Sequence, residues 1–244
     1  TPSAPSATEV RYQVTGVAAN DVLNVREKPD VASKKVYSFA PGVKNIRLTG
    51  QHQEKGATPW VEVAFEGGTG WVNRTFLAEL HPGGGCNDPE VAATIRAFMK
   101  AVSASDSLAL KATVSPLRGL VVQPETRPLK FSGVQLDTIF SSPTVLNLGP
   151  REGGGAEVSG TFKAQIEPSL RASILKKGAQ EKCGKILVGS GSAPSLDSFS
   201  GTPVSFFYPG EEAGGTDWLT WIGVIEYVEG KPYFYQLTQY HHTL

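Results

Sequence analysis

The sequence predicts a mainly β protein built from two domains, a small β-barrel at residues 9–80 and an α+β domain at residues 88–244. Two observations predict this architecture. The first eighty residues hold short apolar runs separated by Gly and Pro, which is typical of a small all-β barrel or sandwich. The later residues begin with a helical pattern and continue with branched and aromatic runs, so we expect N-terminal helices packed on a curved antiparallel sheet.

Two segments of small residues flank the predicted barrel. Residues 1–8 are rich in Pro and Ser, carry no charge and contain no apolar side chain larger than Ala and Pro, which indicates a tether. Residues 81–87 contain the run Gly83-Gly84-Gly85, and we expect them to link the domains. Because the chain starts without Met, we expect a processed form that has lost a signal peptide, and a lipid anchor on the precursor is compatible with such a tether.

The first domain divides into strands at its Gly and Pro residues. In each predicted strand apolar and polar residues partly alternate, so that one side faces a core. The strands and turns are Leu23–Arg26 with Pro29, Pro41-Gly42 with residues 43–48, Trp60–Phe65, the hairpin Gly67–Gly70, and the return strand from Trp71-Val72 to Phe76-Leu77. So small a barrel has little core. We expect much of it to come from Leu23, Val25, Phe39, Trp60, Phe65 and Trp71, the alternative being that Trp60 and Trp71 contact a ligand.

Together these features resemble the bacterial SH3-like domain over residues 9–80. The opening strand Leu23–Arg26 with Pro29, and the hairpin Gly67–Gly70 with Trp71-Val72, carry the resemblance. It implies an exported protein, in the periplasm, at the cell surface or secreted. It also implies non-catalytic binding of cell-wall peptide or glycan, or of an envelope protein. The binding residues that we expect from it surround the barrel loops, at Asn24, Arg26 and Arg74.

Local signals define the helices of the second domain. Asp88 can cap the free amides of a helix start, Pro89 suits the first helical position, and apolar residues then recur on one face. A shorter helix is expected to start at Ser105-Asp106. A third is expected between residues 161 and 177, where Pro168 must kink or divide it.

The remaining runs of branched and aromatic residues predict strands. They are residues 119–122, 129–136, 186–188, 204–208, 218–228 and 233–240, with an antiparallel hairpin at Glu229-Gly230-Lys231-Pro232. The segments Phe206–Gly210, Gly215–Trp218 and His241-His242-Thr243 resemble, in this order, an uncharacterised C-terminal domain of exported bacterial SH3-containing proteins and lipoproteins. The order of helices and strands is similar to a nuclear-transport-factor-2-like cone. This resemblance implies no activity.

Aromatic and polar residues concentrate on the last three predicted strands. A curved sheet could gather some of them on a concave face, where aromatic rings with a few polar groups bind a glycan or a peptide. The alternative is that the rings form the core between sheet and helices, with Asp217 capping a strand edge and the histidines at a solvated terminus. The candidate binding residues are Tyr208, Asp217, Trp218, Tyr240 and His241, with Trp221, Tyr235 and His242 on the same strands.

The sequence contains two cysteines, Cys86 and Cys183. In an exported protein an isolated pair usually forms a disulfide. Two free thiols are an alternative, and metal binding is a weaker one because no Cys-x-x-Cys spacing accompanies them. Cys183 with His241 or His242 could instead form a thiolate peptidase site. A cell-wall or glycan hydrolase is therefore a second function class beside binding, and a structural interaction module is a third.

Composition and motif spacing narrow these classes. The 23 basic and 23 acidic residues cancel and neither domain is polarised, so we expect no nucleic-acid partner. No apolar run is long enough to span a membrane. The glycines of the stretch Gly178 to Gly184 are one residue too far apart for a phosphate loop, and no serine sits in a Gly-x-Ser-x-Gly frame. The histidines lack paired metal-ligand spacing, so we expect neither a metal nor another cofactor.

Overall fold

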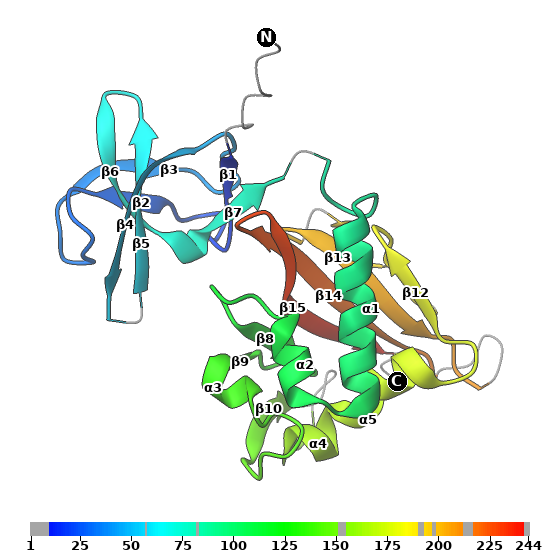
Figure 1. Cartoon of the computed structure of the whole chain (residues 1–244). Coiled ribbons are helices and arrows are strands. Elements are labelled where there is room, and N and C mark those ends of the chain that lie inside the picture. The colour runs from blue at the N-terminus through cyan, green and yellow to red at the C-terminus, as the bar shows by residue number, and fades with distance from the viewer. Residues whose placement is uncertain are drawn as a thin grey trace. The chain divides into compact units, whose positions relative to one another are not determined.

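The structure is a computed structural model that describes residues 10–56, 58–81, 83–150, 155–189, 193–196, 199–211 and 217–241. Strands hold 42% and helices 20% of the chain, so the protein is mainly β, as the sequence predicts. The chain divides into two compact units, residues 1–82 and residues 83–244 (Figure 1). Each unit has its own hydrophobic core.

The described strands of the first unit form two sheets. The elements are β1 (Arg11–Val14), β2 (Leu23–Arg26), β3 (Lys35–Phe39), β4 (Arg47–Lys55), β5 (Thr58–Phe65), β6 (Gly68–Asn73), the single-turn helix η1 (Arg74–Phe76) and β7 (Leu77–Leu80). One sheet has the order β3-β2-β6-β5-β4, and β1 pairs with β7 in the other. An isolated bridge between Tyr12 and Ile46 joins the two. Neither sheet closes on itself, so the described strands do not form the closed barrel that the sequence predicts.

Alternation along the strands sets the core of the first unit. On β5, Val61 and Val63 face the core, whereas Trp60 and Glu62 lie on the other side, so the alternation itself is as the sequence predicts. Trp71 is half-buried and pairs with Arg26 and Glu62, so it belongs to that other side and its predicted core role is wrong. The core itself is made of Val14, Leu23, Val25, Phe39, Ile46, Val61, Val63, Val72 and Leu77.

A close approach of two strands explains the glycine before Trp71. At Gly70 of β6, an added Cβ would lie 2.7 Å from the Val25 side chain and 2.9 Å from the Arg26 carbonyl oxygen of β2. Contacts that short do not occur between real side chains and backbone. Gly70 is therefore the residue that allows β6 to pair with β2.

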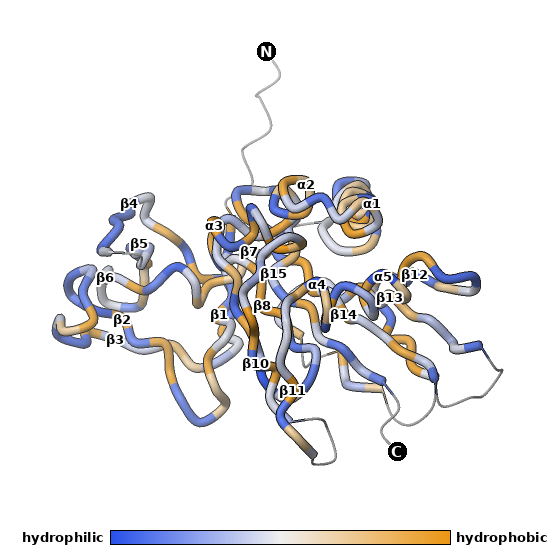
Figure 2. Tube along the Cα trace, turned by 90° about the horizontal axis from the view of Figure 1, so that it is seen from below, coloured by the Kyte–Doolittle hydropathy of each residue, from blue (hydrophilic) through white to orange (hydrophobic). Residues whose placement is uncertain are grey.

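The second unit places helices on a six-stranded sheet. Its elements are α1 (Pro89–Ala104), α2 (Ser107–Ala112), β8 (Leu120–Gln123), β9 (Leu129–Phe131), α3 (Gly133–Leu136), β10 (Leu146–Pro150), β11 (Glu157–Gly160), α4 (Phe162–Gln165), α5 (Glu167–Leu175), β12 (Gln180–Cys183), β13 (Thr202–Tyr208), β14 (Leu219–Val228) and β15 (Lys231–His241). The sheet order is β12-β13-β14-β15-β8-β9, antiparallel except for the pair β15-β8. Figures 1 and 2 show α1 and α2 on one face of this sheet.

Helix α1 forms as its sequence predicts. The Asp88 carboxylate accepts a hydrogen bond from the Glu90 amide at 2.8 Å, and Pro89 follows the cap. The apolar face is buried, and the Phe98 ring lies 5.4 Å from Phe206 and 4.4 Å from Phe234 of the sheet. The face of α1 that the sequence predicts is therefore the one that meets the sheet.

Two predicted strands of the second unit are wrong. The predicted strand at 129–136 stops after β9, because Ser132 and Gln135 form a capping box that starts α3. Residues 186–188 form no strand. Instead, the Leu187 amide donates to Ser205 Oγ at 3.1 Å, and the Leu187 carbonyl accepts from Thr220 Oγ1 at 2.6 Å. This segment therefore bonds to side chains on one face of the sheet, while the edge of the sheet is β12.

Two other predictions hold with shorter bounds. The helical region at 161–177 divides into α4 and α5 at Ile166, two residues before Pro168. The hairpin between β14 and β15 turns on two residues, Glu229 and Gly230, which have φ angles of 52° and 76°. Positive φ at both positions is the geometry of the tight turn that matches the twist of paired strands.

Candidate functional site

The first unit contains a pocket of about 400 Å³. It lies where the segment before β2, the strand β2 itself and the neighbouring parts of β5 and β6 meet. Its lining mixes apolar, amide and charged side chains: Gly16, Val17, Ala18, Asp21, Val22, Leu23, Asn24, Arg26, Val31, Trp60, Asn73 and Phe76. Two of the three binding residues predicted for this domain, Asn24 and Arg26, are in this set.

Trp60 forms an aromatic wall of the pocket. It pairs with Asn73 across β5 and β6 and is only 4% exposed, although it lies on the side opposite the strand's core residues. No hydrogen bond joins its indole N–H to any part of the chain that the structure describes. Trp60 is therefore buried, as the sequence predicts, and it also lines the pocket.

The polar groups of the pocket differ in how they are held. The Asn73 side-chain oxygen accepts from the Thr75 amide at 3.0 Å and from the Thr75 hydroxyl at 2.8 Å, which leaves its NH₂ group as a donor. The Arg26 guanidinium donates to the Ser33 carbonyl at 2.7 Å, and this bond fixes the guanidinium. Its other N–H groups can still donate to a ligand. Asn24 makes no side-chain hydrogen bond to the described residues. Three amide or guanidinium groups are thus available to a ligand.

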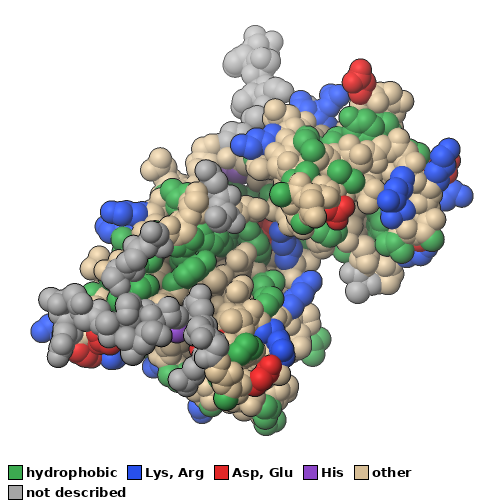
Figure 3. Space-filling model, turned by 180° about the vertical axis from the view of Figure 1, so that it is seen from behind, with side chains coloured by type: hydrophobic (Ala, Val, Ile, Leu, Met, Phe, Trp, Pro, Cys, Tyr) green, Lys and Arg blue, Asp and Glu red, His purple; other side chains and the backbone are tan. Residues whose placement is uncertain are grey.

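Exposed apolar side chains border the pocket. Val22 and Val31 are both in its lining, and Val31 is 72% exposed. Figure 3 shows apolar side chains at the surface of the first unit among Lys and Arg side chains. Exposed apolar residues grouped at a concave site indicate binding. The described lining has one carboxylate and no His, Cys, Ser or Lys, so it holds no pair of nucleophile and base.

Arg74, the third predicted binding residue of this domain, lies elsewhere. It is buried, donates to the Leu77 carbonyl, and its guanidinium carbon is 4.7 Å from the centre of the Tyr12 ring. These contacts tie η1 to β1 and give Arg74 a structural role. The sequence shows it as a polar residue near a loop, and does not show that the loop turns it inward.

The aromatic residues predicted for a concave face in the second unit are mostly core. Trp221 is fully buried, with its indole N–H donating to Ser169 Oγ at 3.2 Å. Tyr208 is buried beneath the Lys176 ammonium, which lies 4.6 Å from the ring centre. Trp218 packs so closely on Gly189 that an added Cβ there would lie 2.3 Å from the indole.

The polar members of that predicted group lie just before β14 and at the end of β15, which pair with each other. Asp217 accepts a hydrogen bond from the Glu211 amide at 2.7 Å, which agrees with the alternative that it caps a strand edge. His241 lies 3.8 Å from the Glu125 carboxylate, and Tyr240 pairs with Thr220 across β14 and β15. His242 lies outside the described residues. The strand register thus brings Tyr208, Trp218, Tyr240 and His241 to one end of the sheet, where Tyr208 and Trp218 are buried.

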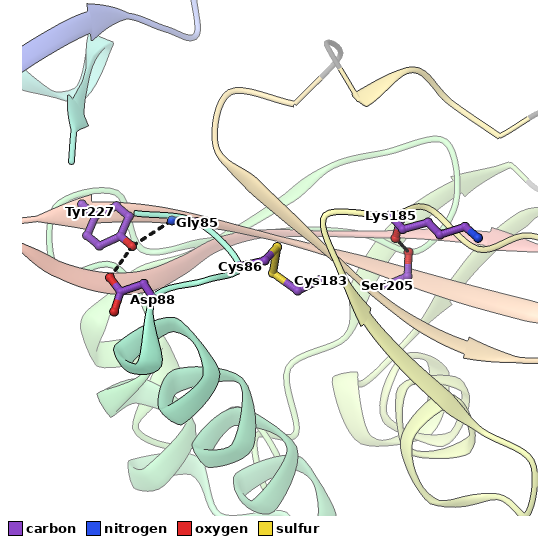
Figure 4. Close-up of a disulfide and its surroundings, with 7 residues drawn as sticks. All are labelled: Gly85, Cys86, Asp88, Cys183, Lys185, Ser205 and Tyr227. Atoms are coloured by element: carbon purple, nitrogen blue, oxygen red, sulfur yellow. Dashed lines mark hydrogen bonds between the residues drawn. A yellow bond between two sulfur atoms is a disulfide. The ribbon is translucent and has the colours of Figure 1, made fainter. Parts of the chain in front are cut away.

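The two cysteines form a disulfide, as the sequence predicts (Figure 4). Next to it, the Tyr227 hydroxyl accepts from the Gly85 amide at 3.1 Å and donates to Asp88 at 2.7 Å. Burial, together with the hydrogen bond to Asp88, raises the pKa of Tyr227. Gly85 and Cys86, expected to be part of a linker, are thus held to the second unit. Cys183 has no free thiol, which removes the nucleophile of the peptidase alternative.

No helix in the described part of the chain has the length and apolar content needed to cross a membrane. No protein family, no curated protein and no solved structure matches the chain.

A buried tyrosine should make the second unit sensitive to alkali. Burial raises the pKa of Tyr235 to about 12, above the usual value of 10.0. Between these two pH values the unfolded chain loses the proton and the folded chain keeps it, so stability falls as the pH rises. We expect Tyr235→Phe to remove a loss of about 1 kcal/mol per pH unit from urea unfolding curves measured between pH 10 and 12. Tyr37→Phe, at an exposed tyrosine, is the control, and an equal effect of both changes would contradict the expectation.

Proposed function

We propose that this protein is a non-catalytic binding protein of the bacterial cell envelope, and that the pocket of its first unit binds cell-wall peptide or glycan. The observation that carries the proposal is the pocket itself, which brings Asn24 and Arg26 together with the Trp60 ring. Both polar residues are implied by the SH3-like resemblance, and ligand contact by Trp60 is the alternative that the sequence leaves open beside a core role. A protein partner of the envelope is the alternative ligand.

The side chains of the pocket suit a peptide that carries a carboxylate. The Trp60 ring can pack against the apolar parts of a peptide or against a sugar ring. The amide groups of Asn24 and Asn73 can bond to peptide groups, and a guanidinium binds carboxylates well. We propose that Arg26 fixes the orientation of the ligand and that the amide groups of Asn24 and Asn73 form hydrogen bonds with the main chain of the peptide.

We also propose that the first unit is a bacterial SH3-like domain. The motifs that carry the resemblance fall on β2 and at the hairpin between β5 and β6, which the structure pairs in one sheet. The disulfide fits an exported protein, because disulfides persist in oxidising compartments. The likeness of the second unit to a nuclear-transport-factor-2-like cone stays a prediction, and its helices on one face of the sheet support it.

Binding can be tested by co-sedimentation with purified cell-wall sacculi. We expect the full chain to sediment with sacculi, and Asn24→Ala to weaken the interaction about tenfold, which corresponds to about 1.4 kcal/mol. Gln51→Ala, at an exposed amide outside the pocket, is the matched control and should bind like the unchanged protein.

Three results would count against the proposal. They are no sedimentation of the intact protein, equal losses in Asn24→Ala and Gln51→Ala, or release of soluble wall fragments during incubation. The last result would favour a hydrolase with a site elsewhere in the chain. A stable complex recovered from envelope extracts, with no affinity for sacculi, would favour the structural module.

A further inference from the structure

The two large sheets end in four edge strands that differ in how they are protected. An unpaired edge can add a strand from another chain, and proteins usually block it with short strands, bulges or charges. β9 has three residues, β12 is the polar segment Gln-Glu-Lys-Cys, and β4 is polar with an irregularity between Leu48 and His52. β3 (Lys35–Phe39) also has an irregular register, where it pairs with Val25 and Arg26 of β2, but among these four described edges it is the one that carries large exposed apolar side chains.

Two apolar side chains of β3 are exposed, and one of them, Tyr37, is held in place by other rings. Val36 is 38% exposed and Tyr37 is 40% exposed. The Tyr37 ring stacks on Phe65 with its centre 4.6 Å away and the planes 11° apart, and it meets Phe39 edge-on at 5.2 Å. An exposed ring held from two sides is ready to bind apolar side chains without losing further conformational freedom.

The surroundings of β3 are basic. Lys28, Lys34 and Lys35 are exposed, and no acidic group in the described chain forms an ion pair with them. Asp30, which lies between them in the sequence, is bonded to Lys55. Glu27 lies beside these lysines in the sequence, and the exposed Glu66 follows Phe65, whose ring stacks on Tyr37. An approaching strand therefore meets an excess of positive charge.

We propose that β3 is a docking edge for an extended acidic peptide segment of a partner protein. The peptide would pair with the main-chain groups on the side of β3 that no described strand covers, place its apolar side chains against Val36 and Tyr37, and place its acidic side chains near Lys34 and Lys35. Like charges on facing strands oppose pairing, so these lysines disfavour a second copy of β3 as the occupant. No residue of β3 lines the pocket, although Asn24 and Arg26 of the pocket pair with Ser38 and Lys35 of β3.

The test uses a labelled eight-residue peptide of alternating Glu and Val, and the same peptide with Lys in place of Glu. We expect fluorescence anisotropy to show binding of the acidic peptide to the full chain, weaker binding at higher salt, and no binding of the basic peptide. Hydrogen exchange should slow at the amides of residues 35–39. The double change Lys34→Glu with Lys35→Glu should weaken binding at least tenfold.

Matched controls separate this site from the rest of the chain. Lys130→Glu with Lys163→Glu, at exposed lysines of the second unit, and Asn24→Ala in the pocket should leave peptide binding unchanged. Equal binding of both peptides, no binding of the acidic peptide, or binding without slower exchange in β3 would overturn the proposal. Self-association of the unchanged protein through β3, seen by analytical ultracentrifugation and lost in Val36→Glu, would assign the edge to a second copy and would also overturn it.

Discussion

The double change Cys86→Ala with Cys183→Ala is expected to lower the free energy of unfolding of the second unit by about 4 kcal/mol. The two residues are 97 positions apart in the chain. In the chain-entropy model a crosslink that closes a loop of about 100 residues removes enough freedom from the unfolded chain to stabilise the fold by about 4 to 5 kcal/mol, less any strain. In the folded protein the disulfide joins the segment before α1 to the edge strand β12.

Urea unfolding with hydrogen exchange can assign this loss to one unit. Amides of α1 and β13 should exchange faster in the double variant, whereas amides of β5 and β6 in the first unit should not change. Reductant supplies the control, because it should shift the unchanged protein to the midpoint of the variant and leave the variant unaffected. A midpoint that responds to reductant in both proteins, or in neither, would contradict a stabilising disulfide.

Features specified by contiguous residues were predicted from the sequence. Helix α1 is the clearest case, because the cap at Asp88, Pro89 and the apolar face lie within a few turns of one another. The two-residue turn at Glu229-Gly230 is similarly local. The Cys86–Cys183 pairing was predictable for a different reason, since the chain contains two cysteines and so allows one pair.

Features set by tertiary contacts were predicted poorly. The polar sequence of β12 does not predict a strand. The strand forms because β13 pairs with it and because the disulfide of Cys183 holds its end in place. The sequence correctly places Trp71 and Val72 on opposite faces of the sheet. It does not show which of these faces meets the core. The pocket was missed as a unit because Asp21, Trp60 and Asn73 come from three separate segments. The alternation that puts Trp60 opposite Val61 was the signal that could have found it.

Glu226→Gln is expected to lower the stability of the second unit by about 3 kcal/mol, although it replaces only one carboxylate oxygen with an NH₂ group. Glu226 Oε2 lies 2.9 Å from Arg118 Nε, and Oε1 accepts from the Ser115 hydroxyl at 2.6 Å. The Glu226 side chain is 1% exposed and that of Arg118 is 12% exposed. Removing one charge leaves the Arg118 guanidinium buried without its counter-charge, which typically costs 3 to 5 kcal/mol, and the remaining amide retains part of the bonding.

A surface pair in the same unit provides the matched control. Glu157 lies 3.6 Å from Arg127, and its side chain is 55% exposed, so Glu157→Gln should change the stability by less than about 0.5 kcal/mol. The double change Arg118→Met with Glu226→Leu should recover most of the loss, because it removes both buried charges at similar volume. Urea unfolding of the three variants distinguishes the cases. Equal small effects of Glu226→Gln and Glu157→Gln would show that solvent screens the Arg118 pair, and a double variant less stable than Glu226→Gln would show that the hydrogen bonds at this position matter more than the charge.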